Sequence, residues 1–273
     1  MTHDILAVVS DLHVGSTLGL IPSSGADLDD GGHYRPNDAQ LWLHSCFVNF
    51  TQRVRASVKR GDQLHVIVNG DAVDRITKSA QVWSVNDVDV IRAAVNVLGP
   101  LREMVKGGGF FVVRGTETHV GLSGALEEAL AVQLRATPWP ADAATRSVFY
   151  LRLQLSGVGI DVAHHGRAGT HEWTRTNPLG AMAVNLALEY AKHDERLPAL
   201  AIRSHTHRYA DSGDNFPIRM LATPAWQLQT AYGQKIAPGR LPDIGGVLVA
   251  CEGGRADVTC VRYLPQREAA WTA

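Results

Sequence analysis

The sequence predicts a single α/β domain, and three observations support that class. Several short apolar runs, typical of buried strands, each end in an Asp or a His. The first half of the chain has the order strand, helix, strand, which is typical of a parallel crossover unit. A chain of 273 residues can bury a full core, and the candidate site residues extend over most of it. We therefore expect one domain that covers residues 1–273.

The first crossover unit is predicted from residues 5–9, 38–60 and 64–68. The first and third segments are apolar and strand-like, whereas the apolar residues of the middle segment recur every three or four positions, as on one face of a helix. Asn37 or Asp38 is a suitable N-cap for that helix. The two strands should therefore lie parallel in one sheet.

The remaining elements follow from the same patterns. We expect helices at residues 86–106, 122–135 and 177–191, with a kink or break in the first of them at Gly99-Pro100. Strands are predicted at residues 110–113, 148–155, 160–163 and 200–203, and a closing hairpin at residues 247–251 and 258–263. Residues 15–37 are predicted to form a loop beside the site, and residues 211–241 to be irregular.

The candidate site residues stand where five predicted strands end. These residues are Asp11 and His13, Asp71 and Asp74, His119, His164 and His165, and His205 and His207. Because the carboxyl ends of parallel strands meet at one edge of a sheet, we expect these side chains to lie together. His205 and His207 are two residues apart, so in an extended chain both would point to one side.

Carboxylate oxygens and imidazole nitrogens together suit borderline divalent ions such as Mn²⁺, Fe²⁺ or Zn²⁺. The three cysteines are widely spaced and form no Cys-x-x-Cys pair, which disfavours a structural zinc site. Two ions about 3.5–4 Å apart can polarise phosphoryl oxygens and lower the pKa of water. Such a pair needs a bridging carboxylate, and Asp71 is the candidate because its strand lies between the other ligands.

The order of the motifs resembles the calcineurin-like metallophosphoesterases. It reads Asp-x-His, Gly-Asp-x-x-Asp, Gly-x-x-x-His, His-Gly and His-x-His, and it extends from Asp11 to His207. The resemblance implies an α/β sandwich of two mixed β-sheets flanked by helices (α/β/β/α). It also implies two divalent metal ions, Mn, Fe or Zn with Mn favoured, that hydrolyse phosphate esters.

The resemblance also implies a role for each motif residue. One ion would be held by Asp11, His13, Asp71 and His207, and the other by Asp71, His165 and His205. Preferring His165 over His164 rests on the family pattern of a His before a Gly. The resemblance further implies that His119 is the acid that protonates the leaving oxygen, and an imidazole suits that role near neutral pH.

The third motif departs from the family. Relatives usually carry Gly-Asn-His, with the Asn on the second metal, but this chain has Gly115-Thr116-Glu117-Thr118-His119. Either the Glu117 carboxylate or the Thr116 hydroxyl could replace the Asn, or a water could fill its position. Alternatively, Glu117 points to solvent from an altered loop. We include Glu117 among the predicted metal ligands.

Asp74 and Arg75 complete the second motif as in the phosphoprotein phosphatase branch of the family, although Ile76 replaces the Gly that usually follows. The likeness implies that Arg75 contacts the substrate phosphate; the alternative is a surface arginine. We expect Asp74 to accept a hydrogen bond from a ligand histidine. Asp74, Arg75 and His119 are therefore the predicted catalytic residues.

The overall charge limits the partners. With a formal net charge of -1 and a pI near 6.9, the protein has no global basic field that would attract nucleic acid or an anionic membrane. The start of the chain lacks the basic residues of a signal peptide, and no apolar run approaches the length of a membrane span. We expect a cytoplasmic protein without a membrane partner, and we predict no oligomeric state.

Three functional hypotheses follow. The favoured one is a dinuclear metal-dependent phosphoesterase, and we slightly favour a phosphodiester, a nucleotide or nucleic acid, as its substrate class. The second is a phosphomonoesterase or protein phosphatase, which needs no basic surface. The third, from another class, is a non-catalytic binding module on a phosphoesterase fold. Such modules lose metal ligands, whereas this chain keeps seven of eight expected positions.

Overall fold

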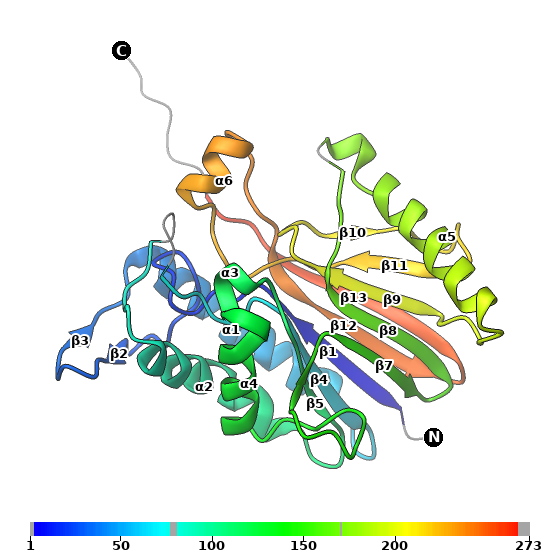
Figure 1. The fold of residues 1–273 in the computed structure, drawn as a ribbon, viewed down its shortest axis with the longest axis horizontal. Helices are drawn as coiled ribbons and strands as arrows, with labels where there is room; N and C mark the ends of the chain where they lie inside the picture. Colours follow the sequence, from blue (N-terminus) through cyan, green and yellow to red (C-terminus); the bar gives the residue numbers. More distant parts are fainter. Residues whose placement is uncertain (1–2, 77–80, 170, 267–273) are drawn as a thin grey trace.

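The computed structural model describes residues 3–76, 81–169 and 171–266, and two β-sheets form its centre (Figure 1). Within these residues, one sheet has the order β13-β12-β1-β4-β5-β6, with β13 at Arg255–Tyr263, β12 at Ile244–Glu252, β1 at Asp4–Val9, β4 at Gln63–Asn69, β5 at Phe110–Val113 and β6 at Ser147–Val148. The other has the order β10-β11-β9-β8-β7, with β10 at Ala210–Asp211, β11 at Arg219–Ala222, β9 at Leu200–Ser204, β8 at Val158–His165 and β7 at Tyr150–Leu155. Both sheets contain parallel and antiparallel pairs.

Helices cover the outer faces of both sheets (Figure 1). The longer helices are α1 at Asp38–Ser57, α2 at Asp87–Met104, α4 at Ala125–Gln133 and α5 at Asn177–Lys192. The shorter ones are α3 at Glu117–Val120, α6 at Ala231–Ile236, and the 3₁₀ turns η1 at Leu122–Gly124 and η2 at Glu172–Thr174. The first sheet carries α1, α2 and α4 on its outer face and the second carries α5, so the predicted α/β/β/α sandwich is confirmed.

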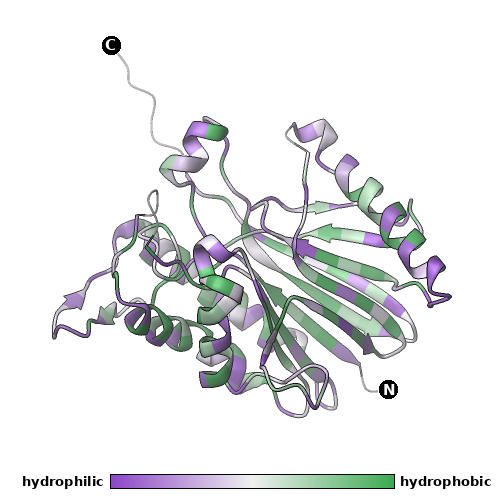
Figure 2. Cartoon of the chain, viewed as in Figure 1, coloured by the Kyte–Doolittle hydropathy of each residue, from purple (hydrophilic) through white to green (hydrophobic). Residues whose placement is uncertain are grey.

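Strand β1 shows how the layers are held together. Ile5, Ala7 and Val9 belong to the apolar cluster between the first sheet and its helices. Leu6 and Val8 belong to the cluster between the two sheets. Because successive side chains of a strand point to opposite faces, a fully apolar strand is stable only when both of its faces are covered. Figure 2 shows the resulting concentration of hydrophobic residues along the central strands.

Most of the predicted elements are present, and α1 begins as predicted. The side chain of its N-cap, Asn37, accepts a hydrogen bond from the Gln40 backbone N–H, and Gln40 returns one to the Asn37 N–H, which completes a capping box. Of the kink or break predicted in the second helix, the break does not occur, because α2 continues through Pro100, and the kink stays a prediction. Proline removes the bond to the carbonyl of Asn96, but both residues are exposed, so water can solvate that carbonyl.

The prediction that residues 211–241 are irregular is also wrong. They contain β11, which pairs in parallel with β9, and the helix α6. These elements have only four and six residues, too few to show a period in the sequence. The predicted loop at residues 15–37 contains a small hairpin of β2 at Ala26–Asp27 and β3 at His33–Tyr34.

None of the helices in the described part of the chain is both long and apolar enough to span a membrane. The organisation of residues 1–273 as one domain and the cytoplasmic location stay predictions.

Candidate metal centre

The site lies at the carboxyl ends of β1, β4 and β9, where the backbone turns sharply. Asp11, His13, Asp71, His205 and His207 all have φ between 46° and 73°, a region that non-glycine residues rarely adopt. Such strain persists only where the surrounding structure holds it, and it commonly marks a functional site. The extended chain that we expected between His205 and His207 is therefore wrong. Their rings instead enter two different clusters.

The first cluster consists of Asp11, His13 and His207, whose candidate ligand atoms lie within 4.8 Å of one another. The two Nε2 atoms of His13 and His207 are 3.3 Å apart, and His207 Nε2 is 3.4 Å from Asp11 Oδ1. Asp11 and His13 are buried. Backbone bonds from Asp11 N to Gly70 O and from His13 N to Asp71 O, both 2.9 Å, fasten this loop to the end of β4.

This cluster fits a divalent cation. Asp11 Oδ1 and His13 Nδ1 are buried, and neither has a hydrogen-bond partner among the described residues. Buried polar atoms without partners are rare in folded proteins, so each one requires an explanation. One carboxylate and two imidazoles that converge on one point are a donor set that suits Mn²⁺, Fe²⁺ or Zn²⁺. A bound cation would explain both their convergence and the unpaired Asp11 oxygen.

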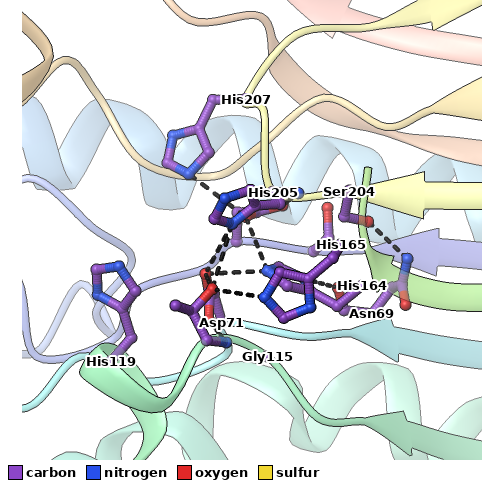
Figure 3. Close-up of polar contacts among 12 residues, drawn as sticks. Asn69, Asp71, Gly115, His119, His164, His165, Ser204, His205 and His207 are labelled. Carbon is purple, nitrogen blue, oxygen red and sulfur yellow. Dashed lines mark hydrogen bonds and ion pairs between the residues drawn. The ribbon is translucent and has the colours of Figure 1, made fainter. Parts of the chain in front are cut away.

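The second cluster consists of Asp71, His164 and His205. Figure 3 shows the rings of His164, His165 and His205 gathered on one side of Asp71, with His119 on the other side. His164 Nε2 lies 3.0 Å from Asp71 Oδ2 and 4.0 Å from Asp11 Oδ1, so the two clusters are adjacent. This arrangement is compatible with two neighbouring ions, while the bridging role of Asp71 stays a prediction.

His164 and His165 occupy different environments at the end of β8. His164 is buried, and its Nδ1 donates to the Asn69 carbonyl at 2.7 Å. Burial would lower its pKa, but the Asp71 carboxylate outweighs that effect and raises it to about 10. His165 is exposed, and its ring centre lies 5.1 Å from that of His205. The structure therefore places His164 against Asp71 and the predicted ligand His165 beside it.

Thr116 occupies the position at which we looked for a substitute for the missing Asn. Its hydroxyl lies 3.3 Å from Asp71 Oδ2, 3.2 Å from His205 Nδ1 and 3.5 Å from His165 Nε2. Its backbone N–H also donates to Asp71 Oδ1 at 2.6 Å. Glu117 is exposed and accepts a hydrogen bond from the Ser123 N–H, so the structure does not bring this predicted ligand to the cluster.

Asp74 connects the first cluster to His119. Its Oδ1 accepts from His119 Nδ1 at 3.0 Å, and its Oδ2 lies 3.5 Å from His13 Nδ1. Burial alone would raise the pKa of Asp74, but these two histidines outweigh it and lower the pKa. Burial would likewise lower the pKa of His119, and the hydrogen bond to Asp74 raises it instead. Asp74 thus lies beside His13, while its hydrogen bond to that candidate ligand stays a prediction, and it orients the predicted acid His119.

Arg75 does not line the cavity of the site. Its backbone N–H donates to the His119 carbonyl at 3.2 Å, and its guanidinium lies against Gly121. The arginines that do line the cavity are Arg208 and Arg240. Arg208 pairs with Glu172 and donates to the Gly169 carbonyl at 2.7 Å. Contact between Arg75 and substrate stays a prediction.

Glu127, on α4, lies directly behind the site, and sequence reasoning missed it. It is fully buried and accepts hydrogen bonds from the N–H groups of Ala72 at 3.0 Å and Gly115 at 2.6 Å. Burial, reinforced by the nearby Asp71 carboxylate, raises its pKa to about 7. It therefore ties the two motif loops together. A carboxylate three residues before Leu130, on the apolar face of the predicted helix, was the signal that could have revealed it.

The two clusters open into one cavity of about 770 Å³. His13, Asp71, His119, His205 and His207 line one side of it, and residues between 227 and 242 line the other. The metal-ligand candidates are therefore accessible to a ligand much larger than inorganic phosphate.

Comparisons with known proteins place the chain among remote structural relatives. No family model matches the sequence, and no curated protein matches it. Solved structures do match. A dimetal phosphatase from Danio rerio shares 11% identity over 94% of this chain and 95% of its own, with a TM-score of 0.45. A predicted phosphoesterase from Streptococcus pneumoniae shares 12% identity over 96% of this chain and 91% of its own, with a TM-score of 0.39.

A zinc complex of Vps29 from Entamoeba histolytica also matches, with 12% identity over 95% of this chain and 98% of its own and a TM-score of 0.40. These solved structures include proteins named as a phosphatase or a phosphoesterase, the kind of protein that the motif order of the sequence led us to expect. Identities and TM-scores this low carry no further argument, so the function of this chain has to be argued from its own side chains.

Proposed function

We propose that this protein is a metal-dependent phosphoesterase that uses two divalent ions, with Mn²⁺ favoured. One observation carries the proposal: two adjacent clusters of carboxylate and imidazole, and a histidine oriented by a carboxylate, line a single cavity. These side chains place both candidate metal ligands and a candidate acid in the same cavity. The hydrogen bond from His119 to the buried Asp74 carboxylate also raises the pKa of His119, and such perturbed groups gather at functional sites.

The ligand sets follow from the two clusters. Asp11, His13 and His207 would hold the first ion. Asp71 and His205 would hold the second, together with His164 or His165 and the Thr116 hydroxyl. When bound, two divalent ions supply Lewis acidity toward phosphoryl oxygens and toward a nucleophilic water.

His119 is proposed to protonate the leaving oxygen. Because its Nδ1–H donates to Asp74, the proton that can be transferred is the one on Nε2 of the protonated ring. The carboxylate of Asp74 fixes the orientation of the ring and favours its protonated form. His119 also lines the cavity, so an ester bound at the clusters would have its leaving oxygen within reach of the ring.

The favoured substrate is a small phosphodiester, such as a nucleotide, rather than a long nucleic acid. The cavity has room for organic groups on both sides of a phosphate. Three of the arginines near the motifs are paired with carboxylates: Arg175 with Asp243, Arg203 with Asp161 and Arg208 with Glu172. Paired arginines leave little positive charge for a continuous phosphate backbone.

The test is hydrolysis of a chromogenic phosphodiester beside the matching monoester, with Mn²⁺, Zn²⁺ or no added metal. We expect metal-dependent turnover, faster for the diester, that disappears in Asp71→Asn. Turnover of the monoester alone would replace the diesterase with a phosphomonoesterase. If the purified protein neither contained nor took up Mn²⁺, Zn²⁺ or Fe, the enzyme would be rejected in favour of a binding module.

A further inference from the structure

The cavity has a second wall that the metal chemistry does not use. It comes from the chain between residues 227 and 242, including α6, and it faces the candidate ligands across the same space. In Figure 1 the orange α6 stands apart from the helices that cover the two sheets. A phosphate at the clusters would occupy only a small part of about 770 Å³. The remaining volume is bounded by this wall.

Apolar side chains dominate the wall. Tyr232 and Ile236 are four residues apart on α6 and therefore share one helix face, and Leu228 and Leu241 extend the surface. Tyr232 is 63% exposed and Ile236 is 62% exposed. None of the residues of α6 is buried, so this helix does not serve the core. Large apolar side chains that line a cavity without packing in a core indicate a ligand.

Hydrogen bonds organise the wall internally, and the Leu228 N–H, which donates to the Leu18 carbonyl at 2.9 Å, ties its start to the rest of the protein. The N-cap hydroxyl of Thr230 accepts from the Gly233 N–H at 3.2 Å, and Gln229 Nε2 donates to the Ala237 carbonyl at 2.9 Å. The second bond ties the segment before α6 to its C-terminal end. A tethered wall costs less ordering entropy on binding than a free loop would.

The charges around the cavity suit an ester that is anionic at one end and apolar at the other. Among the described residues that line the cavity, the only carboxylates are Asp71 and Asp74, both on the metal-ligand side. The wall itself contributes Arg240 and no acidic side chain. An anionic substrate therefore meets no carboxylate repulsion on this side.

We propose that this wall binds the organic part of the substrate, and that the substrate class is a phosphate ester carrying an aromatic group. The inference rests on the proposed function, because it places the phosphate at the metal clusters. Tyr232 offers a ring face for stacking, and Ile236 and Leu228 offer apolar contact beside it. Esters with small alkyl groups leave the wall empty.

The test uses binding, so it does not depend on turnover. Phenylphosphonate and methylphosphonate present the same anion and cannot be hydrolysed as esters. Calorimetry on the Mn²⁺-loaded protein should show that phenylphosphonate binds at least about tenfold more tightly than methylphosphonate. Partial burial of a phenyl ring contributes that much to the affinity. In the double variant Tyr232→Ala with Ile236→Ala, the preference should fall to about threefold or less. Tyr232→Phe, which keeps the ring, should retain it.

A matched control replaces two exposed apolar residues elsewhere. Val184 and Leu188 on α5 are 43% and 56% exposed, and neither lines the cavity. Val184→Ala with Leu188→Ala should keep the full phenyl preference. Circular dichroism of every variant checks the fold, and alanine is a good helix former, so α6 should persist.

The outcomes separate this inference from the proposed function. If the protein takes up metal but binds the two phosphonates equally, or binds neither, the inference is overturned and the phosphoesterase proposal stands. A phenyl preference that survives in the double variant also overturns it, because the ring would then bind elsewhere. If no metal is taken up, the proposed function fails, and this inference fails with it.

Discussion

The two metal-ligand clusters differ in how far their hydrogen bonds are already satisfied. In the first, Asp11 Oδ1 and His13 Nδ1 are buried without a hydrogen-bond partner among the described residues. In the second, both oxygens of Asp71 accept hydrogen bonds, from the Thr116 N–H and from His164. The side chains also differ in exposure, since His207 is 25% exposed and His205 is 42% exposed.

This difference implies unequal metal sites. A cation that enters the first cluster finds Asp11 Oδ1 without a hydrogen bond, 3.4 Å from His207 Nε2, and replaces only the proton between the imidazoles of His13 and His207. A cation that enters the second must replace the proton shared by His164 and Asp71, a charge-assisted hydrogen bond. We therefore expect the first ion to bind more tightly than the second. A bridging Asp71 would couple the two affinities.

Replacing Asp71 should have the largest effect. In Asp71→Asn, an NH₂ group replaces one carboxylate oxygen, so the side chain can no longer serve as an anionic ligand. We expect turnover to fall below detection. Metal analysis then distinguishes two cases. If Asp71 bridges, both ions are lost; if it belongs to the second cluster alone, one ion per chain remains. Two retained ions would show that Asp71 is not a ligand.

Replacing His119 should be next in size and should spare the metals. We expect His119→Asn to lower turnover of alkyl phosphodiesters by about 10²–10⁴-fold, because the leaving alkoxide then lacks its proton donor. The loss for a p-nitrophenyl ester should be small, since nitrophenolate needs no proton. An equal loss for both leaving groups would remove His119 from the acid role.

Replacing Glu127 tests the support behind both loops. Glu127→Gln turns one acceptor into an N–H donor that faces the backbone N–H of Ala72 or Gly115. We expect a loss of about 10–100-fold in metal affinity at the second cluster, the usual range for groups that orient ligands. Glu128→Gln, at the adjacent and more exposed position, is the matched control. If Glu127→Gln left the metal affinity unchanged, Glu127 would contribute to the fold alone and not to metal binding.

Replacing Thr116 should have the smallest effect and should distinguish the substitutes for the missing Asn. We expect Thr116→Val to lower the affinity for the second ion by about tenfold, the usual contribution of one hydrogen bond or weak ligand. Thr116→Ser should leave that affinity unchanged. Glu117→Gln should leave metal binding unchanged, because Glu117 contacts Ser123 instead. A loss in Glu117→Gln rather than in Thr116→Val would restore Glu117 as the ligand.

The sequence could predict the features of the fold and the site that depend on neighbouring residues, and could not predict those that depend on contacts between distant segments. Strands β1, β4 and β5 and helix α1 follow from apolar period and capping, which are properties of neighbouring residues. The strand ends then give Asp11, His13 and Asp71, because a parallel sheet brings such ends together. Their positive φ angles and the separate destinations of His205 and His207 depend on contacts between distant segments.

Three features of the site could not be predicted for the same reason. The position of Thr116, rather than Glu117, beside Asp71 depends on the residue at which α3 begins. The role of Glu127 depends on its contact with the loop after β4, where Ala72 is 55 residues away in sequence. The second wall depends on the six-residue α6, which has too few residues to show a pattern.

Titration of the metal-free protein with Mn²⁺ in a calorimeter compares the two metal sites in one experiment. We expect two binding events per chain that differ in affinity by about tenfold or more, because one charge-assisted hydrogen bond is broken at the weaker site. His13→Ala should remove the tighter event, and His205→Ala the weaker one. A single event of one ion, two events of equal affinity, or the loss of the weaker event in His13→Ala would contradict this expectation.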